Sequence, residues 1–470
     1  MDINPSIFHP YDIRGKYPEE INEDAAYRLG RGFVNFLRKN DESRILTIVA
    51  GRDSRLSSPL LFASFASGVT DEGCDVVDIG LVPTPMLYYA VRTFSYDGGA
   101  MVTASHNPNP YNGFKFAGGE GISLSENSGL ALLKKYTLSY PFLPGGAMVA
   151  DHVGRAPKGK VIKKNLERVY VQSTFELANV KPKELKGIRV AVDAAHGSGG
   201  AVVMQILEKA GAEIISLCMK PDGHFPHHVP DPVARGNLDD IVAFIKDAKP
   251  VMGVALDGDA DRIVFLDERG ETVPADIVTA LFAEMLLTQR KGGRKKIKIL
   301  YDFRSSNVVP EIIARNGGVP VPYRVGHSYI QRKMKKDRIL FGGELVGHYY
   351  WGDGLYYEVP FVVMLKLMRL LHESKVPLSE LVAPLQKYFH SGEINFKTQN
   401  WERISGRLEK KYAQGKKNAK DGLRVDFRDW WFLVRPSNTE PLIRLVVEAH
   451  SKEKMEKKKK ELSSLISSLV

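Results

Sequence analysis

The sequence predicts an α/β protein with three related mixed-sheet α/β domains and a smaller C-terminal α+β domain. The first observation is a pattern that occurs three times, in which an apolar strand, a polar loop, a helix, a glycine and a second strand follow one another. Such crossovers build parallel or mixed sheets. The second observation is that the tail alternates short strands with a lysine-rich helix. The tail therefore belongs to a different, α+β pattern.

The three copies of the repeat occupy residues 45–79, 189–217 and 298–323. Because they share one order of elements, we interpret them as three degenerate copies of one unit. None contains a complete Gly-x-Gly-x-x-Gly motif or a P-loop. In the second copy, Val202 stands where a third glycine would follow Gly197 and Gly199. The sequence therefore disfavours dinucleotide binding.

Domain boundaries are expected where proline, glycine and basic residues interrupt the pattern. Residues 141–146 and the basic loop 154–160 separate the first unit from the second, and Lys249-Pro250 precedes the third. A helical region over residues 362–388 is expected to close the third unit. The predicted domains are 1–150, 151–252, 253–388 and 389–470, with the acidic motif described below at the start of the third.

The composition limits the classes of function. The chain has 470 residues, 43% of them hydrophobic, and a formal net charge of +11. Much of the positive charge lies in lysine runs at residues 290–298, 410–420 and 452–460, which contain few aromatic residues for base stacking. We interpret these runs as solvated faces, and a basic nucleic-acid-binding protein remains the alternative of another class.

Cysteine usage and the N-terminus predict a cytoplasmic, soluble protein. The two cysteines, Cys74 and Cys218, are far apart, which supports neither a disulfide framework nor a cysteine zinc site. The N-terminus lacks the apolar core of a signal peptide, and no uncharged apolar stretch approaches the ~20 residues of a membrane span. No membrane partner is expected.

A turn around Ser105 is the first motif that indicates chemistry. Small and apolar residues lead into Ser105, His106, Asn107 and Pro108, and the proline prevents a helix. We expect a rigid turn that presents Ser105 as an exposed nucleophile. The same residue types also form ordinary turns, so the motif by itself leaves both readings open.

Three carboxylates at alternate positions form the second motif. Asp257, Asp259 and Asp261 follow an apolar strand and precede Arg262. Hard oxygen ligands at this density favour Mg²⁺ or Ca²⁺ over zinc. An EF-hand is disfavoured because Arg262 occupies its required glycine position and residues 263–266 are strand-like. A structural acidic turn is the weaker alternative, since adjacent carboxylates repel one another without a cation.

Two further segments contain residues that are suited to binding a phosphate group. Residues 435–441 combine Arg435 with short polar side chains and a tight turn, a set that suits a phosphate dianion, although a plain turn is equally consistent with these residues. Near the N-terminus, Tyr11 and Arg14 can reach a phosphate or cap the first domain.

Together these motifs resemble the phosphohexomutases, the phosphomannomutase/phosphoglucomutase family, over essentially the whole chain and in the family's order. The resemblance implies four domains around a central cleft and a phosphoserine at Ser105. It implies Mg²⁺ bound by Asp257, Asp259, Asp261 and the phosphate on Ser105. It also implies reversible transfer between the 1- and 6-positions of mannose or glucose phosphates, through a hexose 1,6-bisphosphate that also acts as activator.

The resemblance assigns roles to individual residues. Lys115 is the expected general base if its neighbours lower its pKa, His106 or His327 can assist, and Arg262 faces the substrate. The implied substrate-binding residues are Tyr11, Arg14, Arg324, Gly326, Glu344, His348, Arg435, Ser437, Asn438 and Thr439. The expected partner is a small sugar phosphate, with no nucleic acid, and the chain is expected as a monomer or small homo-oligomer.

Three positions depart from the family pattern. Ala260 stands for a usual glycine in the acidic motif, Val346 for a usual serine in the sugar-reading loop 342–348, and Phe303 for a frequent lysine in the third repeat. These departures leave the reaction class intact but leave the sugar open, and a phosphohexosamine (glucosamine) mutase is the alternative enzyme.

Overall fold

The computed structural model describes residues 3–39, 41, 44–139, 157–289, 296–398, 400–437 and 441–470. The chain divides into two compact units. Unit 1 comprises Met1–Thr272 and His348–Ser379, and unit 2 comprises Val273–Gly347 and Glu380–Val470. Most of the predicted boundary at 141–146 and 154–160, and most of the lysine run at 290–298, lie outside the described residues.

The first sheet of unit 1 is a mixed sheet with helices on both faces. Its region contains η1 (Pro5–Ile7), β1 (Ile13–Lys16), α1 (Glu23–Arg38), β2 (Thr47–Arg52), α2 (Ser58–Asp71), β3 (Asp75–Leu81), α3 (Thr84–Thr93), β4 (Gly98–Val102), β5 (Tyr111–Gly118), η2 (Glu126–Ser128), α4 (Leu130–Ser139) and β6 (Val161–Lys163). The strand order is β1-β5-β4-β2-β3-β6. β2 runs parallel to β3 and β4, whereas β5 is antiparallel to β1 and β4.

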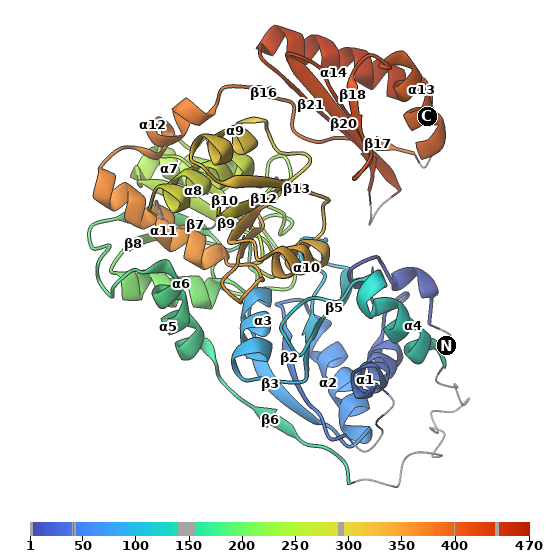
Figure 1. Ribbon diagram of the computed structural model, residues 1–470. Helices are drawn as coiled ribbons and strands as arrows, with labels where there is room; N and C mark the ends of the chain where they lie inside the picture. The colour runs from blue at the N-terminus through green and yellow to red at the C-terminus, as the bar shows by residue number, and fades with distance from the viewer. Residues whose placement is uncertain are drawn as a thin grey trace. The chain divides into compact units, whose positions relative to one another are not determined.

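Close packing on β4 shows which helix covers which face. In Figure 1, α1 and α3 lie on either side of the strand labelled β2. A Cβ atom on Gly98 would lie 2.9 Å from Phe33 of α1, and one on the next residue, Gly99, would lie 2.5 Å from Val91 of α3. Because successive strand residues point to opposite faces, α1 and α3 cover opposite faces of the sheet. The α1 face holds the main aromatic core, in which Phe33 packs on Phe116 at 4.7 Å.

The second sheet also belongs to unit 1. Its region contains α5 (Glu167–Ala178), β7 (Arg189–Asp193), α6 (Gly200–Ala210), β8 (Glu213–Leu217), α7 (Asp239–Ala248), β9 (Met252–Leu256) and β10 (Ile263–Leu266), and β11 (Thr272–Val273) lies at the border of the units. β9, β7 and β8 are adjacent and parallel, and β10 pairs with β9 in the antiparallel sense.

One predicted domain boundary needs correction here. The predicted third domain began at residue 253, but β9 pairs with both β7 and β10, so the acidic motif is a loop within the second sheet. The helix expected to close the third domain is α11 (Pro360–Ser374), and it packs with unit 1, as does β15 (Tyr349–Trp351). Its Phe361 ring packs edge-on against Tyr170 of α5 at 6.4 Å, and Lys366 donates to the Ala178 carbonyl. The apolar face of α11 is therefore buried on the second domain.

Unit 2 contains the third repeat and the C-terminal sheet. The third repeat comprises α8 (Ala275–Gln289), β12 (Lys298–Asp302), α9 (Val308–Arg315), β13 (Val319–Tyr323), α10 (His327–Asp337) and β14 (Phe341–Gly343), followed later in the chain by α12 (Leu378–Val382) and η3 (Ala383–Leu385). β12 lies between β13 and β14 and is parallel to both.

The C-terminal region is a separate, largely antiparallel sheet. It contains β16 (Phe389–His390), β17 (Ile394–Lys397), α13 (Trp401–Lys411), β18 (Lys416–Asn418), β19 (Leu423–Asp426), β20 (Trp430–Pro436), β21 (Leu442–Ala449) and α14 (Lys452–Ser467). β18, β19, β20 and β21 pair in sequence, and β16 and β17 both pair with β21. The predicted fold class, three related α/β repeats and a smaller α+β domain, is confirmed. In the described parts of the chain, no helix has both the length and the apolarity that a membrane crossing requires.

Candidate active site

The turn that carries Ser105 is organised by the side chain of Arg55, which follows β2. The guanidinium donates to the backbone carbonyl oxygens of Ser105, Asn107, Pro108 and Tyr111, at 2.8, 2.5, 2.9 and 2.8 Å. Ser105 has φ = 51°, in the left-handed region that most residues avoid. A single fully buried arginine therefore holds this turn in an otherwise unfavourable conformation.

Ser105 is not exposed, contrary to the expectation from its turn residues. Its side chain is 2% exposed, and its Oγ donates to Asp257 Oδ2 at 2.8 Å. His106 Nδ1 lies 3.4 Å from the same Oγ. The physical reason is that the acidic loop, 152 residues away in sequence, packs directly over the turn.

Close backbone approach brings the acidic loop to the serine. A Cβ atom on Gly258 would lie 2.5 Å from the Ser105 carbonyl oxygen, so only glycine fits there. The Ser198 amide donates to the Gly258 carbonyl at 2.9 Å and fixes the loop from the β7 side. Ala260 has φ = 51°, which accounts for the glycine usual at this position.

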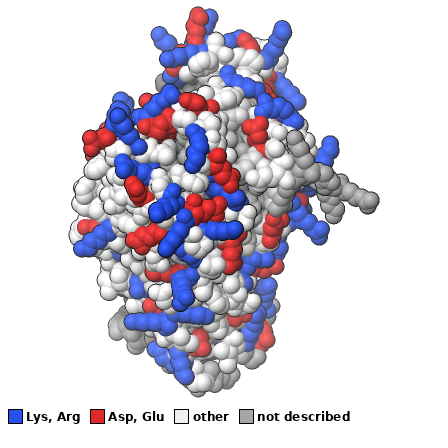
Figure 2. All heavy atoms as spheres, turned by 90° about the vertical axis from the view of Figure 1, so that its left-hand side faces the viewer, with Lys and Arg blue, Asp and Glu red and all other residues white. Residues whose placement is uncertain are grey.

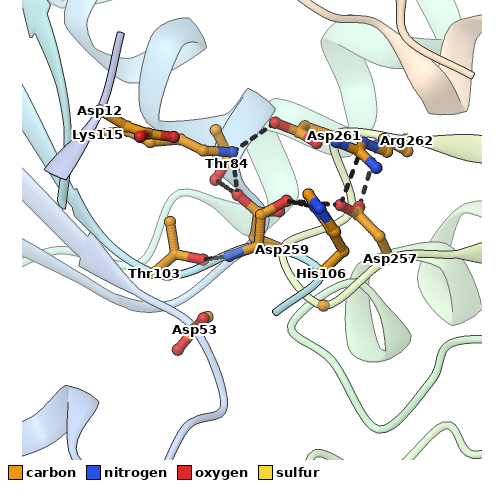
Figure 3. A network of polar contacts seen from close by, with 12 residues as sticks. Asp12, Asp53, Thr84, Thr103, His106, Lys115, Asp257, Asp259, Asp261 and Arg262 are labelled. Atoms are coloured by element: carbon orange, nitrogen blue, oxygen red, sulfur yellow. Dashed lines mark hydrogen bonds and ion pairs between the residues drawn. The ribbon is translucent and has the colours of Figure 1, made fainter. Parts of the chain in front are cut away.

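The three loop carboxylates are buried and close together, as Figure 3 shows. Lys115 on β5 lies between two of them, with its Nζ 2.6 Å from both Asp259 Oδ2 and Asp261 Oδ2. Thr84, at the start of α3, donates its hydroxyl to Asp259. The first and second domains therefore both contribute side chains to this cluster.

The electrostatics of Lys115 contradict the expectation of a lowered pKa. Burial favours the neutral amine, but the attraction of Asp259 and Asp261 outweighs it and holds the pKa of Lys115 well above its ordinary value. Lys115 is therefore protonated in this arrangement. It supplies positive charge to the cluster.

The acidic cluster fits a hard divalent cation. One oxygen from each of Asp257, Asp259 and Asp261 lies within 4.8 Å of the others. Asp259 Oδ1 and Asp261 Oδ1 are buried without a hydrogen-bond partner. Burial, together with the charges of Asp261 and Asp259, raises the pKa of Asp257 well above its ordinary value. Since three carboxylates converge here and two of their oxygens have no hydrogen-bond partner, the cluster can hold a metal ion.

Cations and histidines surround the cluster. Arg262 Nε donates to His348 Nε2 at 3.2 Å, and the other ring nitrogen of His348 lies 3.1 Å from the Asp261 carbonyl. Burial lowers the pKa of His348 to about 4. Arg14 on β1 donates to Asn107 Oδ1 at 2.7 Å and so contacts the Ser105 turn, and Tyr11 is half-buried just before β1.

Unit 2 brings together a second group of predicted residues. The Gly326 amide donates to Glu344 Oε2 at 3.2 Å, which joins the turn before α10 to the sugar-reading loop. His327 is the buried first residue of α10, and Arg324 stacks on Tyr329 with 3.8 Å from guanidinium carbon to ring centre. Glu344 is itself buried and lies 3.8 Å from Arg304.

Asp421, in the turn between β18 and β19, connects this group to Arg435. Its Oδ2 accepts from the Val325 amide at 3.1 Å and lies 3.4 Å from Arg435 Nε. The Ser437 amide donates to the Leu442 carbonyl at 2.8 Å, across the turn of residues 435–441 that the sequence predicts to bind phosphate. The other two substrate-binding residues predicted in this turn, Asn438 and Thr439, lie outside the described residues.

Two of the positions that depart from the family pattern, Phe303 and Val346, lie in unit 2 and have different surroundings. Phe303 is buried and packs with Trp431, Leu433 and Val446, so it joins the third repeat to the C-terminal sheet. Val346 is half-buried in the turn after β14. Phe303 is thus an apolar packing residue, whereas Val346 leaves a hydroxyl-free position in the sugar-reading loop.

Sequence reasoning missed three residues that position the site: Arg55, Thr84 and Asp421. Arg55 stands in the polar segment Gly51 to Arg55 directly after a predicted strand, and its place at the carboxyl end of β2 was the available signal. Thr84 and Asp421 act through contacts 175 and 96 residues away in sequence. No local pattern marks such contacts.

Known family models match the chain in the order of the domains described above. Four family models match the chain: Phosphoglucomutase/phosphomannomutase alpha/beta/alpha domain I at residues 5–138, domain II at 168–270, domain III at 274–388, and the C-terminal domain at 393–464.

Individual relatives agree with these matches. The chain is 34% identical over 466 residues to a phosphomannomutase of Methanocaldococcus jannaschii, covering 98% of each chain. It is 33% identical to a phosphomannomutase/phosphoglucomutase of Pseudomonas syringae pv. tomato, covering 96% of this chain and 93% of that protein. A crystal structure of a family protein from Burkholderia thailandensis superposes with a TM-score of 0.86 at 28% identity, covering 99% and 98% of the two chains.

Proposed function

The chain belongs to the phosphoglucomutase/phosphomannomutase family and is a hexose phosphate mutase, and we propose that Ser105, in phosphorylated form, is the group that exchanges phosphate with the sugar. The observation that carries this proposal is the 2.8 Å hydrogen bond from Ser105 Oγ to Asp257 in a cluster suited to a cation. A phosphate on this oxygen would stand beside the groups that can neutralise it.

The reaction balances without an external reactant. The bond between phosphorus and Ser105 Oγ breaks, and a new bond forms between phosphorus and the free hydroxyl oxygen of the hexose phosphate. The hydroxyl proton passes to a base on the protein, and the released Ser105 Oγ takes up a proton to become the serine hydroxyl. The resulting 1,6-bisphosphate turns over and returns its other phosphoryl group to Ser105. The same bisphosphate, supplied in trace amounts, would phosphorylate a dephosphorylated Ser105 and act as activator.

We assign Mg²⁺ to the acidic cluster because its donors are carboxylate oxygens. Asp257, Asp259, Asp261 and the phosphate on Ser105 would hold the ion. When bound, Mg²⁺ supplies positive charge to the phosphoryl group in transfer. Arg262, next to the cluster, adds a fixed positive charge from the protein itself.

His106 is the better candidate for proton acceptor. Burial, with the nearby charges of Arg262 and Arg14, holds the pKa of His106 well below its ordinary value, so the ring is neutral near pH 7. Its Nδ1 lies 3.4 Å from Ser105 Oγ, whereas Lys115 is held in its charged form. A neutral imidazole beside the transferred group can take the hydroxyl proton. Lys115 then balances charge in the cluster.

Substrate recognition is assigned to unit 2. Arg435 and Ser437, with Asn438 and Thr439, would bind the phosphate that is not transferred. Glu344 would accept from sugar hydroxyls, and Val346 offers none of the hydrogen bonds of a serine. Because no polar group of this loop is dedicated to C2, where glucose and mannose differ, we propose turnover of both 1-phosphates, with kcat/KM values within roughly a hundredfold. A glucosamine phosphate mutase remains the alternative, and glucosamine 1-phosphate assayed beside the other two 1-phosphates tests it.

The nucleic-acid-binding alternative gains no support from the molecular face in Figure 2. On that face, lysine and arginine side chains are interspersed with aspartate and glutamate. A continuous basic stripe is the usual electrostatic footprint of nucleic-acid binding. Salt-sensitive binding of DNA or RNA would favour that alternative over the sugar-phosphate site.

The decisive experiment compares Ser105→Ala with Ser464→Ala, a matched change at an exposed serine of α14. Intact-mass analysis should find a phosphoryl group on wild type and on Ser464→Ala but not on Ser105→Ala. Turnover of glucose 1-phosphate and mannose 1-phosphate, with trace bisphosphate, should vanish only in Ser105→Ala. Normal turnover by that variant would overturn the proposal.

A further inference from the structure

A second cluster of metal-ligating side chains lies at the carboxyl ends of β7 and β8, apart from the acidic cluster. His196 follows β7, Cys218 follows β8 directly, and His227 and His228 come from the loop that leads to Pro230. Adjacent parallel strands place the residues after them at one edge of the sheet. One ligand atom each from His196, Cys218 and His227 lies within 4.8 Å of the others.

The hydrogen bonds of His196 leave one nitrogen directed into the cluster. His196 Nδ1 lies 2.8 Å from the Lys220 carbonyl oxygen, so it must carry the proton and donate. His196 Nε2 therefore holds a lone pair, and it accepts from His227 Nδ1 at 2.8 Å. A ring nitrogen that donates to a backbone carbonyl while the other faces the ion is the usual arrangement of a metal-bound histidine.

His228 belongs to a neighbouring ion pair. Its Nδ1 lies 2.9 Å from the Val229 carbonyl and its Nε2 lies 2.9 Å from Asp193 Oδ2. Both partners are acceptors, so both ring nitrogens carry protons and neither offers a lone pair. Cys218 also lies within 4.8 Å of this pair.

The loop that carries His227 is fixed at both ends. A Cβ atom on Gly223 would lie 2.6 Å from the Ser54 carbonyl oxygen, so the loop backbone touches the first domain. At the other end, the Gly258 amide donates to the Pro230 carbonyl. His196 and Cys218 both have left-handed φ, 55° and 48°, and the His196 amide donates to the Cys218 carbonyl at 2.8 Å. The ligands are therefore held in place before any ion binds.

We propose that His196, Cys218 and His227 form a second metal site, for a borderline-soft divalent cation such as Zn²⁺, with water as the fourth ligand. Two imidazole nitrogens and one thiolate form a donor set that prefers Zn²⁺ to Mg²⁺. A tetrahedral ion with Zn–N distances of roughly 2.0–2.1 Å places its two nitrogens roughly 3.3 Å apart. The present 2.8 Å separation of the two imidazoles needs only a small opening once the ion replaces the shared proton. The sequence analysis found no support for a cysteine zinc site, and this site uses a single cysteine with two histidines.

The test titrates the full-length protein with Zn²⁺ or Co²⁺ in excess Mg²⁺, which occupies the carboxylate cluster. We expect one equivalent per chain, and a thiolate-to-cobalt charge-transfer band in the near ultraviolet. His196→Ala, Cys218→Ser and His227→Ala should each weaken binding ~100-fold, since each removes one ligand. Cys218→Ser should also abolish the band. His224→Ala changes an exposed histidine paired with Asp222 in the same loop, and it should bind as wild type.

The outcomes distinguish this site from the acidic cluster. Asp259→Asn, which alters only the carboxylate site, should retain the band and the stoichiometry. Binding that survives Cys218→Ser but is lost in Asp259→Asn would assign the soft cation to the acidic cluster and overturn the proposal. Absence of the charge-transfer band in wild type at saturating Co²⁺ would also overturn it. Mutase turnover of Cys218→Ser and His224→Ala shows that both variants are folded.

Discussion

Replacing Lys115 by methionine tests whether its positive charge stabilises the fold by offsetting the repulsion among the buried carboxylates. Lys115 is 3% exposed and pairs with two buried carboxylates at 2.6 Å. At an effective dielectric constant of about 20, each pair has a gross attraction of about 6 kcal/mol, much of which offsets the cost of burying the charges. Removing one partner of a buried pair costs about 3–5 kcal/mol. The variant should therefore unfold roughly 6–10 °C lower in Mg²⁺-free buffer, at about 2 °C per kcal/mol.

Added Mg²⁺ should reverse much of this loss, because the ion replaces the missing positive charge. Thermal unfolding with and without Mg²⁺ should show a larger rise in Tm for Lys115→Met than for wild type. Lys135→Met, a change at an exposed lysine of α4, is the matched control and should leave both values unchanged. If Lys115→Met were as stable as wild type without Mg²⁺, or if Mg²⁺ raised both Tm values equally, the charge-balancing role would be wrong.

Three further predictions address positioning, specificity and pH dependence. Arg55→Met should lower kcat roughly a hundredfold with little change in KM, because the substitution loosens the turn of Ser105 and Arg55 does not contact the sugar. An unchanged kcat in steady-state kinetics would contradict this positioning role. Glu344→Ala should lower kcat/KM for glucose and mannose 1-phosphates together, by about 1.5–3 kcal/mol for a lost charged hydrogen bond, and equal wild-type values would refute the role. Burial opposes ionisation of Glu461, but hydrogen bonds from two lysines and a tyrosine lower its pKa to about 2 from 4.5. The stability that this carboxylate contributes is therefore present above pH 4.5 and lost as the pH falls through about 2. In denaturant titrations, Glu461→Gln should be less stable than wild type by roughly 0.5–1 kcal/mol at pH 7, and the difference should shrink as the pH falls toward 2.

Local patterns in the sequence determined the elements and the chemistry of each motif. The three repeats were predictable because apolar strands, glycines and helix-forming segments follow one another at short range, and β2, β7 and β12 each pair in parallel with the strand after their helix. The carboxylates after β9 indicated a cation site for the same reason, since all three lie within five residues.

Tertiary structure decided which motifs meet and what their surroundings do to them. Ser105 is buried because a loop 152 residues away covers it, and Lys115 is charged because Asp259 and Asp261 face it across the interface of two domains. Burial and charge pairing depend on neighbours in space. The expected exposure of Ser105 was therefore wrong, and the lowered pKa on which a base role for Lys115 depends is not found in this arrangement. The same limit hid the meeting of His196, Cys218 and His227, because 22 and 9 positions separate them along the chain and only the parallel pairing of β7 with β8 brings them to one edge.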